Sequence, residues 1–377
     1  MTKTPSVNSC ISHINIERCV PQFRSDEIEL GDMIDSGDFC TVYEIQTIQT
    51  SNDHDSMSDK ALSEKTSPLG VKNFFRKNIK LAPYVVKCLS DETKEDLKRF
   101  AVGAADLAMG ARLLASLNHP NITKLRGVSA SGKFGTEQEM GDFLVLDRVE
   151  TTLDKRVIEW RSFSHKSLLR RKSPFSLNKQ RRTFLAKRLR VALDVASALQ
   201  HIRQHDIVYL DLKPENVGFD AYDNVQLFYF GSAKQLDYGS NAKDFNERSG
   251  NKGVQPLTPE VALGLPYNQK ADVYSFGMAP EVALGLPYNQ NADVYSFGLL
   301  LWQIVALAMP FGEIVCEQEH FEYAFKGNYR PPMDPKWPAL LQLLIKNCWQ
   351  PNPTERPDMK LCTKVLNSEI VRLKNVD

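Results

Sequence analysis

The stretch Tyr209-Leu210-Asp211-Leu212-Lys213-Pro214-Glu215-Asn216 decides the fold once it is read with the sequence on either side of it. Only short runs of strand-forming residues surround it, between Val208 and Phe230, and helical patterns dominate from Thr183 onward. The sequence before it contains several short strand patterns. Strands first and helices later indicate an α+β architecture with a small β-rich N-terminal lobe and a larger helical C-terminal lobe.

Local patterns divide the chain into three parts: a flexible N-terminal tail over residues 1–27, an N-terminal lobe over 28–149 and a C-terminal lobe over 150–377. Residues 49–80 are rich in Ser, Asp, Lys and Asn, so we expect a loop insertion there. The elements expected in the N-terminal lobe are a hairpin over Ile28–Ile48, a strand over Tyr84–Leu89, a helix over Asp91–Leu117 and a strand over Asp142–Val149.

The composition is that of an ordinary globular protein, with 42% hydrophobic and 25% charged residues among 377. A formal net charge of +1 gives no indication of nucleic-acid or membrane binding. Seven scattered cysteines form no C-x-x-C pair, so we expect reduced thiols. Met1–Gln22 lacks a signal-peptide pattern, and the longest apolar run, Phe297–Met309, suits a buried helix better than a bilayer span. We therefore expect a soluble cytoplasmic protein, with the nucleus as the alternative.

A basic segment covers Glu159–Arg190, with eleven Lys and Arg residues and Glu159 as its only acid. One interpretation is a docking surface for acidic segments or phosphate groups. The other, which we favour, is a solvated loop and helix face, because no further feature of the segment supports nucleic-acid stacking.

A tandem repeat is present near the middle of the C-terminal lobe. Pro259–Gly277 and Pro280–Gly298 are 21 residues apart and differ only at Lys270, which is Asn291 in the second copy. Two copies are too few for a solenoid, so a tandem duplication is the better explanation. Only the second copy continues into an apolar helix pattern, at Leu299–Ile304. We therefore expect the second copy to occupy the fold and the first to add length to the loop before it.

Four motifs occur in an order that is typical of protein kinases, and the ordered set is much more specific than any one of them. They are Asp35–Val42 in the place of G-x-G-x-x-G-x-V, Tyr84–Lys87 in the place of V-A-I-K, a helix followed by His119–Ile122, and Tyr209–Asn216 in the place of H-R-D-L-K-P-E-N. Over residues 28–368 the chain therefore resembles a eukaryotic protein kinase. Cys348-Trp349 through Arg356-Pro357 is similar to a signature of the tyrosine-kinase-like group, whereas Lys213 is typical of a Ser/Thr-type catalytic loop.

The resemblance implies an ATP site. Gly37 is the one glycine of the phosphate loop that remains, and Lys87 would reach the α- and β-phosphates. The other nucleotide-binding positions implied by the resemblance are Val42, Val85, Leu146, Asp147, Val149 and Asn216.

The resemblance also assigns the chemistry to the central stretch. Asp211 corresponds to the residue that accepts the proton of the substrate hydroxyl, Lys213 to its catalytic partner and Asn216 to a magnesium ligand. Leu210 replaces an Arg that commonly docks a phosphorylated activation loop, so control by that route is not expected.

Other positions depart from the kinase pattern. Asp35 and Cys40 replace two glycines of the phosphate loop. Gly110 stands where the resemblance implies a Glu that pairs with Lys87, and Asp106, one turn earlier, is a poor substitute.

The most damaging departure is in Phe228-Tyr229-Phe230-Gly231, which stands in the place of D-F-G. Tyr229 replaces the Asp that binds magnesium, and a neutral phenol does not supply that carboxylate. The site for Mg²⁺ or Mn²⁺ is therefore expected to be incomplete, and ATP to bind weakly.

The residues with structural roles are retained. The resemblance implies a buried ion pair between Glu281 and Arg356, and a contact of Asp293 with the backbone of the catalytic loop. It also implies an apolar spine formed by Leu114, Leu125, Tyr209 and Phe230.

Three functions are consistent with these residues. The first, which we rank highest, is a pseudokinase or strongly impaired kinase that acts in signalling by binding other signalling proteins, with neither nucleic acid nor membrane as a partner. The second is a weakly active ATP-dependent Ser/Thr protein kinase, since Asp211, Lys213 and Asn216 are all present. The third is the product of a decaying duplicated gene.

Overall fold

A computed structural model describes residues 20–48, 83–130, 142–169, 174–236, 278–286, 288–312 and 321–375. Contacts within the chain divide it into two compact units, which are described separately. The first contains the residues up to Ala104 and Leu125–Arg148, and the second contains Ala105–Lys124 and the residues from Val149 on. The second boundary, after Arg148, thus lies one residue before the expected one, and about half of the helix expected in the N-terminal lobe belongs to the second unit.

The first unit is built on a six-stranded sheet with the strand order β1-β5-β6-β4-β3-β2. All neighbouring strands are antiparallel except β1 and β5, which are parallel. The strands are β1 (Gln22–Phe23), β2 (Ile28–Ser36), β3 (Cys40–Ile48), β4 (Tyr84–Leu89), β5 (Leu125–Ser129) and β6 (Phe143–Asp147). Strands β2 and β3 confirm the hairpin over Ile28–Ile48, and β4 has the predicted bounds.

Alternation along these strands places one buried cluster on one face of the sheet. Paired residues on neighbouring strands point to the same side, and successive residues on one strand point to opposite sides. The buried cluster on one side consists of Ile28, Ile45, Val86, Cys88, Phe143 and Val145. The side chains between them on the same strands therefore lie on the other face.

The sheet begins earlier in the chain than the sequence indicated. The flexible tail was expected to extend to residue 27, but Gln22 and Phe23 pair with Val128 and Ser129 on β5. A 3₁₀ turn, η2 (Ser25–Glu27), follows directly. Two paired residues are too few to produce a visible alternation in the sequence, which is why the pattern missed this strand.

One continuous helix was expected over Asp91–Leu117, but the structure has two, α2 (Asp91–Glu95) and α3 (Leu97–Ser116). Asp96 separates them with an extended backbone, and its carboxylate accepts hydrogen bonds from the backbone N–H groups of Lys98 and Arg99 at 2.8 and 3.1 Å. Asp96 thus acts as a helix N-cap, because its side chain satisfies donors that have no partner inside the helix. The sequence pattern showed the apolar face but not this cap.

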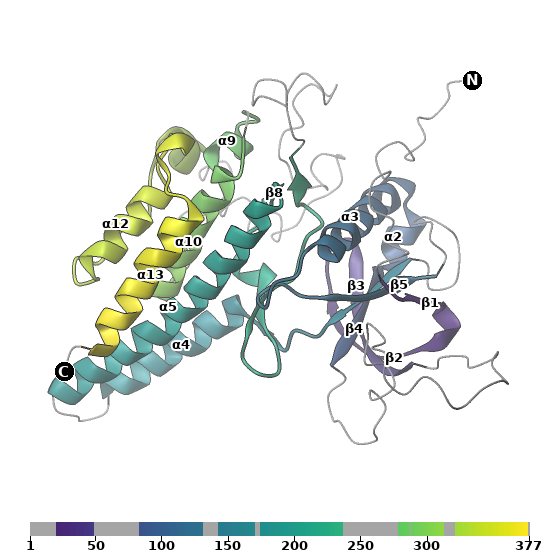
Figure 1. Cartoon of the computed structure of the whole chain (residues 1–377), viewed down its shortest axis with the longest axis horizontal. Helices are drawn as coiled ribbons and strands as arrows, with labels where there is room; N and C mark the ends of the chain where they lie inside the picture. The colour runs from purple at the N-terminus through teal and green to yellow at the C-terminus, as the bar shows by residue number, and fades with distance from the viewer. Residues whose placement is uncertain are drawn as a thin grey trace, which may run out of the picture. The chain divides into compact units, whose positions relative to one another are not determined.

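Helices dominate the second unit, and its strands are only two or three residues long (Figure 1). Its strands are β7 (Thr151–Thr152), β8 (Ile207–Val208), β9 (Val217–Phe219), β10 (Val225–Leu227) and β11 (Lys234–Gln235). Its helices are α4 (Leu153–Leu169), α5 (Pro174–Gln204), α9 (Pro280–Ala283), α10 (Asn291–Ala306), α12 (Ala339–Cys348) and α13 (Met359–Asn375). Single turns are present at η4 (Pro214–Asn216), η5 (Phe321–Lys326) and η6 (Pro353–Glu355). Helices therefore begin at Leu153, about 30 residues before the expected Thr183.

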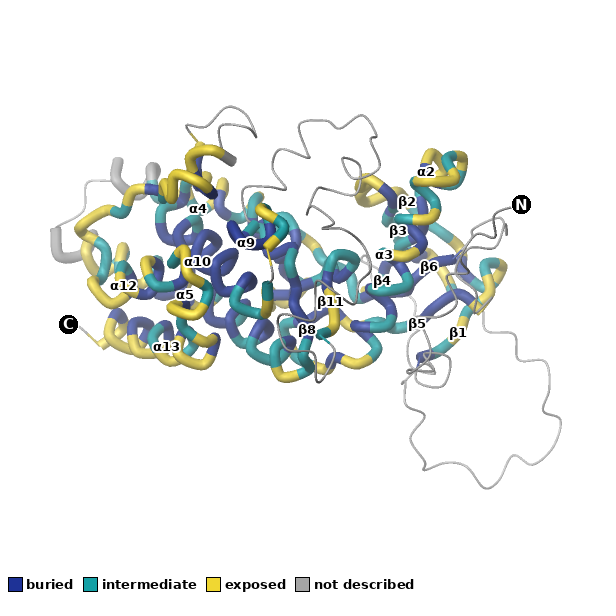
Figure 2. The backbone as a smooth tube through the Cα atoms, turned by 90° about the horizontal axis from the view of Figure 1, so that it is seen from above, coloured by how far each residue is buried: buried dark blue, intermediate teal, exposed yellow. Residues whose placement is uncertain are grey.

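Helix α10 forms the centre of this unit. It packs against α5 and α12, and α13 packs along α5 (Figure 1). Almost every residue from Ala292 to Val305 is buried, and the tube of α10 is dark along most of its length in Figure 2. A helix that is apolar on all sides must be covered by other elements. The prediction of a buried helix for the apolar run that begins at Phe297 is thus confirmed.

The basic segment is helical at both ends, in α4 and α5, and one of its residues is not solvated. Arg188 is buried, and its Nη1 donates to the carbonyl oxygens of Ile304 and Val305 at 2.8 and 3.1 Å. These carbonyls lie in the last turn of α10, where a cation offsets the partial negative charge of the helix end. For Arg188 the favoured interpretation as a solvated face is therefore wrong.

The second copy of the repeat forms α9 and the first half of α10, as expected. The first copy and the expected loop insertion at residues 49–80 lie outside the described residues. The four cysteines that the structure describes are free thiols: Cys40, Cys88, Cys348 and Cys362.

Candidate functional site

The central stretch begins with a turn in an unusual backbone conformation. Leu210 has φ of 65°, in the left-handed region that a branched L-residue rarely adopts. Both carboxylate oxygens of Asp293 accept hydrogen bonds there, from the N–H groups of Tyr209 and Leu210, each at 2.8 Å. Asp293 lies in the first turn of α10, so the buried central helix holds the strained turn in place.

Burial has a clear effect on Asp293. It raises the pKa of this carboxyl group to about 6, although the N–H donors of Tyr209 and Leu210 lower it. The group accepts both hydrogen bonds best as a carboxylate. The turn is thus held most firmly when Asp293 is ionised.

The three polar residues of the stretch contact one another. The Asn216 amide donates to the Asp211 carboxylate at 2.6 Å and to the Asp211 carbonyl at 2.8 Å. The Lys213 ammonium lies 3.3 Å from the other carboxylate oxygen of Asp211. Asp211 and Asn216 are both buried. These contacts fix the orientation of the Asp211 carboxylate and of the Asn216 amide group.

Phe230 anchors the segment Phe228–Gly231 in the second unit. Its ring is buried and meets the ring of Tyr209 edge-on, with centroids 5.1 Å apart. Two of the four expected spine residues are therefore in contact. Leu114 is buried in the same unit, whereas Leu125 belongs to the first.

The Tyr229 side chain, which stands in the place of the metal-binding carboxylate, makes a contact of its own. Its hydroxyl donates to the carboxylate of Asp106 on α3 at 3.3 Å. Magnesium prefers several anionic oxygen ligands in octahedral geometry, and this donor set offers a phenol and the amide of Asn216 beside Asp211. The residues present therefore do not fit the usual magnesium site of this motif.

The residues expected to meet a nucleotide in the first unit lie on one face of its sheet. Lys87 pairs with Val42 on β3 and with Leu144 on β6, and Val85 pairs with Leu146. Since paired residues share a face, these side chains lie opposite the buried cluster of Val86 and its neighbours. Gly37 lies at the tip of the β2–β3 hairpin, where its N–H donates to the Cys40 carbonyl at 2.8 Å.

The same hairpin tip contains a contact that the motif comparison missed. Phe39 is buried, and the space around Gly103 on α3 is filled by Phe39 and Leu89. The Arg99 guanidinium lies 5.4 Å from the Phe39 ring centroid and donates to the Asp38 carbonyl. The tip is thus fixed to α3 by an aromatic residue and a cation, and only the large apolar side chain in a polar loop could have indicated it.

The expected hinge residues make ion pairs within the first unit. Arg126 forms two hydrogen bonds with Asp147, at 2.7 and 3.1 Å, and Arg148 contacts Glu44 at 2.6 Å. The Asp147 side chain is therefore engaged with β5. Val149 lies across the boundary, in the second unit.

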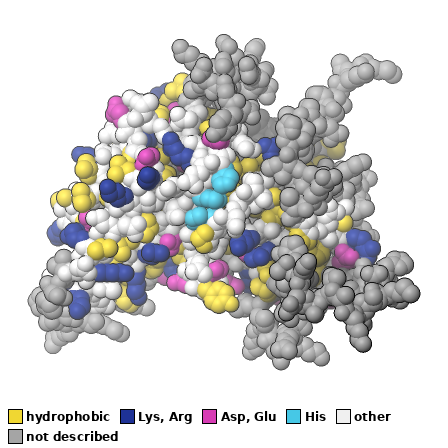
Figure 3. Space-filling view, viewed as in Figure 1, with side chains coloured by type: hydrophobic (Ala, Val, Ile, Leu, Met, Phe, Trp, Pro, Cys, Tyr) yellow, Lys and Arg dark blue, Asp and Glu magenta, His cyan; other side chains and the backbone are white. Residues whose placement is uncertain are grey.

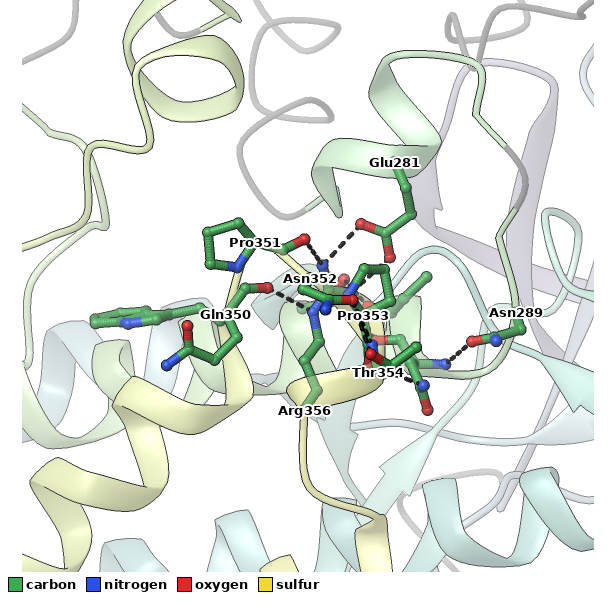
Figure 4. Close-up of polar contacts among 12 residues, drawn as sticks. Glu281, Asn289, Gln350, Pro351, Asn352, Pro353, Thr354 and Arg356 are labelled. Atoms are coloured by element: carbon green, nitrogen blue, oxygen red, sulfur yellow. Dashed lines mark hydrogen bonds and ion pairs between the residues drawn. The ribbon is translucent and has the colours of Figure 1, made fainter.

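Arg356 links the second copy of the repeat to the C-terminal motif. Its guanidinium contacts both carboxylate oxygens of Glu281 at 2.5 and 2.8 Å, and it also donates to the Asn291 carbonyl at 2.9 Å (Figure 4). The ion pair implied by the resemblance is therefore present, and it fixes α9 near the start of α10.

Family comparisons agree with this geometry. Residues 71–278 match the model of the protein kinase domain, and residues 278–366 match the model described as protein tyrosine and serine/threonine kinase. The chain belongs to the protein kinase superfamily. Its relatives place it in the tyrosine-kinase-like group.

Three relatives illustrate the similarity of this kinase domain. Serine/threonine/tyrosine-protein kinase HT1 of Arabidopsis thaliana is 30% identical over 199 residues, which cover 52% of this chain and 42% of HT1. Dual specificity protein kinase shkD of Dictyostelium discoideum is 28% identical over 262 residues, 69% of this chain and 28% of shkD. Mitogen-activated protein kinase kinase kinase 7 of Bos taurus is 26% identical over 169 residues, 45% of this chain and 24% of the relative. The matched part is thus less than half of each relative.

A small cavity of about 40 Å³ lies beside the catalytic loop of this kinase domain, lined among others by Lys213, Glu215 and Gln303. It has room for a water molecule but not for a nucleotide. Burial raises the pKa of Glu215 at its edge. Among the helices that the structure describes, none has the length and apolar character to cross a bilayer.

Proposed function

We propose that this kinase domain is a pseudokinase or a strongly impaired kinase that acts in signalling by binding other proteins. The observation that carries the proposal is the position of Tyr229, which replaces the metal-binding carboxylate and donates its hydroxyl to Asp106. Gly110 adds to this, because a glycine cannot supply the carboxylate that pairs with the β-strand lysine in an active kinase.

The expected loss of rate is large. Phosphoryl transfer depends almost entirely on positioning and electrostatic stabilisation. Removing one stabilising donor from an active site lowers kcat by about 10²–10³-fold in other enzymes. Loss of a metal carboxylate should be no milder, and loss of the lysine partner adds to it, although such effects are not additive.

A weakly active ATP-dependent Ser/Thr kinase is the second candidate, and one observation favours it. Asp211, Lys213 and Asn216 are in contact with one another in the arrangement described above. A metal held by Asn216 and the phosphates of ATP would then support slow transfer. A decaying gene product is the third candidate, and the buried pair of Glu281 and Arg356 argues against it, because the second copy is well accommodated.

Weak ATP binding, signalling partners and a cytoplasmic location remain part of the proposal. The apolar face of the first-unit sheet that includes Val42, Val85 and Leu146 supports binding of a nucleobase.

Transfer of label from γ-labelled ATP to a generic basic protein, and to the chain itself, tests the proposal. The assay uses magnesium or manganese, with Asp211→Asn as the matched control. We expect no signal above this control from protein that unfolds cooperatively. A signal that disappears in Asp211→Asn would contradict the proposal and support the weakly active kinase. The double variant Gly110→Glu, Tyr229→Asp then tests whether these two positions cause the loss.

A further inference from the structure

Helix α3 approaches the Phe228–Gly231 segment closely at Gly110. A Cβ atom at Gly110 would lie 4.0 Å from the backbone nitrogen of Gly231 and 4.0 Å from the carbonyl carbon of Phe230. This is ordinary van der Waals contact for an added Cβ, so only a small side chain fits against the backbone of the segment, where the kinase pattern has a long acidic side chain. Both elements belong to the second unit.

Tyr229 fills the space next to this contact. A Cβ atom at Gly231 would lie 2.9 Å from the Tyr229 hydroxyl and 3.2 Å from the Cβ of Asp106. A distance below 3.0 Å essentially never occurs for a real Cβ atom, so the tyrosine hydroxyl closes the space beside the backbone of Gly231, next to Asp106. Asp106 and Gly110 are four residues apart on α3 and therefore share one face of the helix.

A third contact lies on another face of the helix. The Arg112 guanidinium donates to the side-chain oxygen of Gln235 on β11 at 3.0 Å. The second half of α3 thus meets residues 229–235 at Asp106, at Gly110 and at Arg112. Gly110 and Tyr229 are the positions at which the chain departs most from an active kinase.

We propose that Tyr229 and Asp106 form a clamp that holds the second half of α3 on the Phe228–Gly231 segment, and that Gly110 gives the segment the room it needs. The two departures are then one coupled change and not two independent losses. Protein groups alone maintain the contact. The inference goes beyond the proposed function, because it holds whether or not the chain transfers phosphate.

A double-mutant cycle with Tyr229→Phe and Asp106→Leu tests the clamp. Each variant removes one partner of the hydrogen bond and keeps a side chain of similar shape. We measure the unfolding equilibrium in urea and the hydrogen exchange of residues 106–116 and 228–233. Tyr222→Phe is the matched control, since the Tyr222 side chain is 86% exposed.

Each single variant should shift the unfolding equilibrium about fivefold towards the unfolded state, the usual net effect of one hydrogen bond. Exchange should become faster in both segments, and the double variant should add little to either single one. Tyr222→Phe should change neither quantity. Additive effects of the two substitutions, or unchanged exchange in Tyr229→Phe, would overturn the proposal.

A second pair of variants examines Gly110 and keeps the proposal testable if the cycle variants fold poorly. Gly110→Ala should be tolerated, because a Cβ fits at 4.0 Å and alanine favours helix. Gly110→Glu should accelerate exchange in residues 228–233, because the longer side chain meets the backbone of Phe230 and Gly231. Equal exchange in the two variants would show that the close approach at Gly110 has no such role.

Discussion

Arg356 and Glu281 form a bidentate ion pair in which neither side chain is more than 6% exposed. Residue 260, the counterpart of Glu281 in the first copy of the repeat, is also a Glu. Only Glu281 belongs to the part of the chain that the structure describes, and the sequence places the first copy, with Glu260, in extra loop length. The two carboxylates therefore provide a matched pair of variants that tests this expectation.

Glu281→Gln should destabilise the protein by about 3–5 kcal/mol, because it leaves the buried charge of Arg356 without a carboxylate. The matched control is Glu260→Gln, which makes the same chemical change in the first copy and should alter stability by less than about 0.5 kcal/mol. Urea unfolding measures both. Equal losses in the two variants would show that the first copy also occupies the fold.

The single difference between the copies is a second test. The Asn291 side chain accepts a hydrogen bond from Arg203 at 3.1 Å and donates to the Pro353 carbonyl at 2.9 Å. Asn291→Lys removes the acceptor and adds a cation beside Arg203, so a loss of about 1–3 kcal/mol is expected in urea unfolding. Lys270→Asn is the control and should have little effect. Unchanged stability in Asn291→Lys would mean that these two contacts are not important.

Arg188 allows a third prediction. Arg188→Met keeps much of the packing but leaves the Ile304 and Val305 carbonyls without their donor, and should cost about 1–3 kcal/mol. The neighbouring residue Lys187 is exposed, so Lys187→Met should change stability by less than about 0.5 kcal/mol. Thermal unfolding of the two variants distinguishes a buried helix cap from a solvated basic face.

A group of three histidines predicts that the stability of the fold depends on pH. The ring centroids of His119 and His201 are 5.2 Å apart, and those of His201 and His205 are 4.5 Å apart. Figure 3 shows histidine side chains gathered on one face. Burial, and then the neighbouring histidine, lowers the pKa of His119 and of His201. Their pKa in the folded chain is thus below about 6.5, the value in an unfolded chain. Protons then bind the unfolded state more readily than the folded state. The free energy of unfolding is therefore unaffected by these histidines above about pH 6.5 and decreases as the pH falls below it.

The measurement is the melting temperature at pH 7.5 and pH 5.5. The double variant His119→Gln, His201→Gln should show a smaller decrease between these pH values than the unmodified chain. Since Asn121 and Ser197 contact His119, the variant will also be less stable at both pH values, so the comparison uses the difference for each protein. Equal differences would contradict the prediction.

The sequence predicted the elements whose side chains alternate or repeat over several residues. Tyr84–Leu89 is a strand because its β-branched and apolar residues are buried on both faces of the sheet, and the apolar run after Phe297 is central because almost all of its residues within α10 are buried. Two-residue strands such as Gln22–Phe23 have no such pattern, because their place depends on β5, more than 100 residues away. The cap at Asp96 depends on one carboxylate and leaves no periodic trace.

The same distinction applies to the candidate site. Asp211, Lys213 and Asn216 lie within six residues, so their motif shows them together. The contact of Tyr229 with Asp106 joins residues 123 apart, and no sequence pattern indicates which carboxylate a new phenol will reach. The motif therefore identified what was lost at position 229, but only the structure shows what replaced it.

The near-identity of the two copies has a consequence for the gene. A crossover between them would delete one 21-residue unit and keep either Lys270 or Asn291 at the joined position, depending on where it occurs. Every other residue of the unit would be the same in both products. Only the product that keeps asparagine retains the bond to Arg203, so reversion to a single copy would yield one stable chain and one weakened chain from the same pair of sequences.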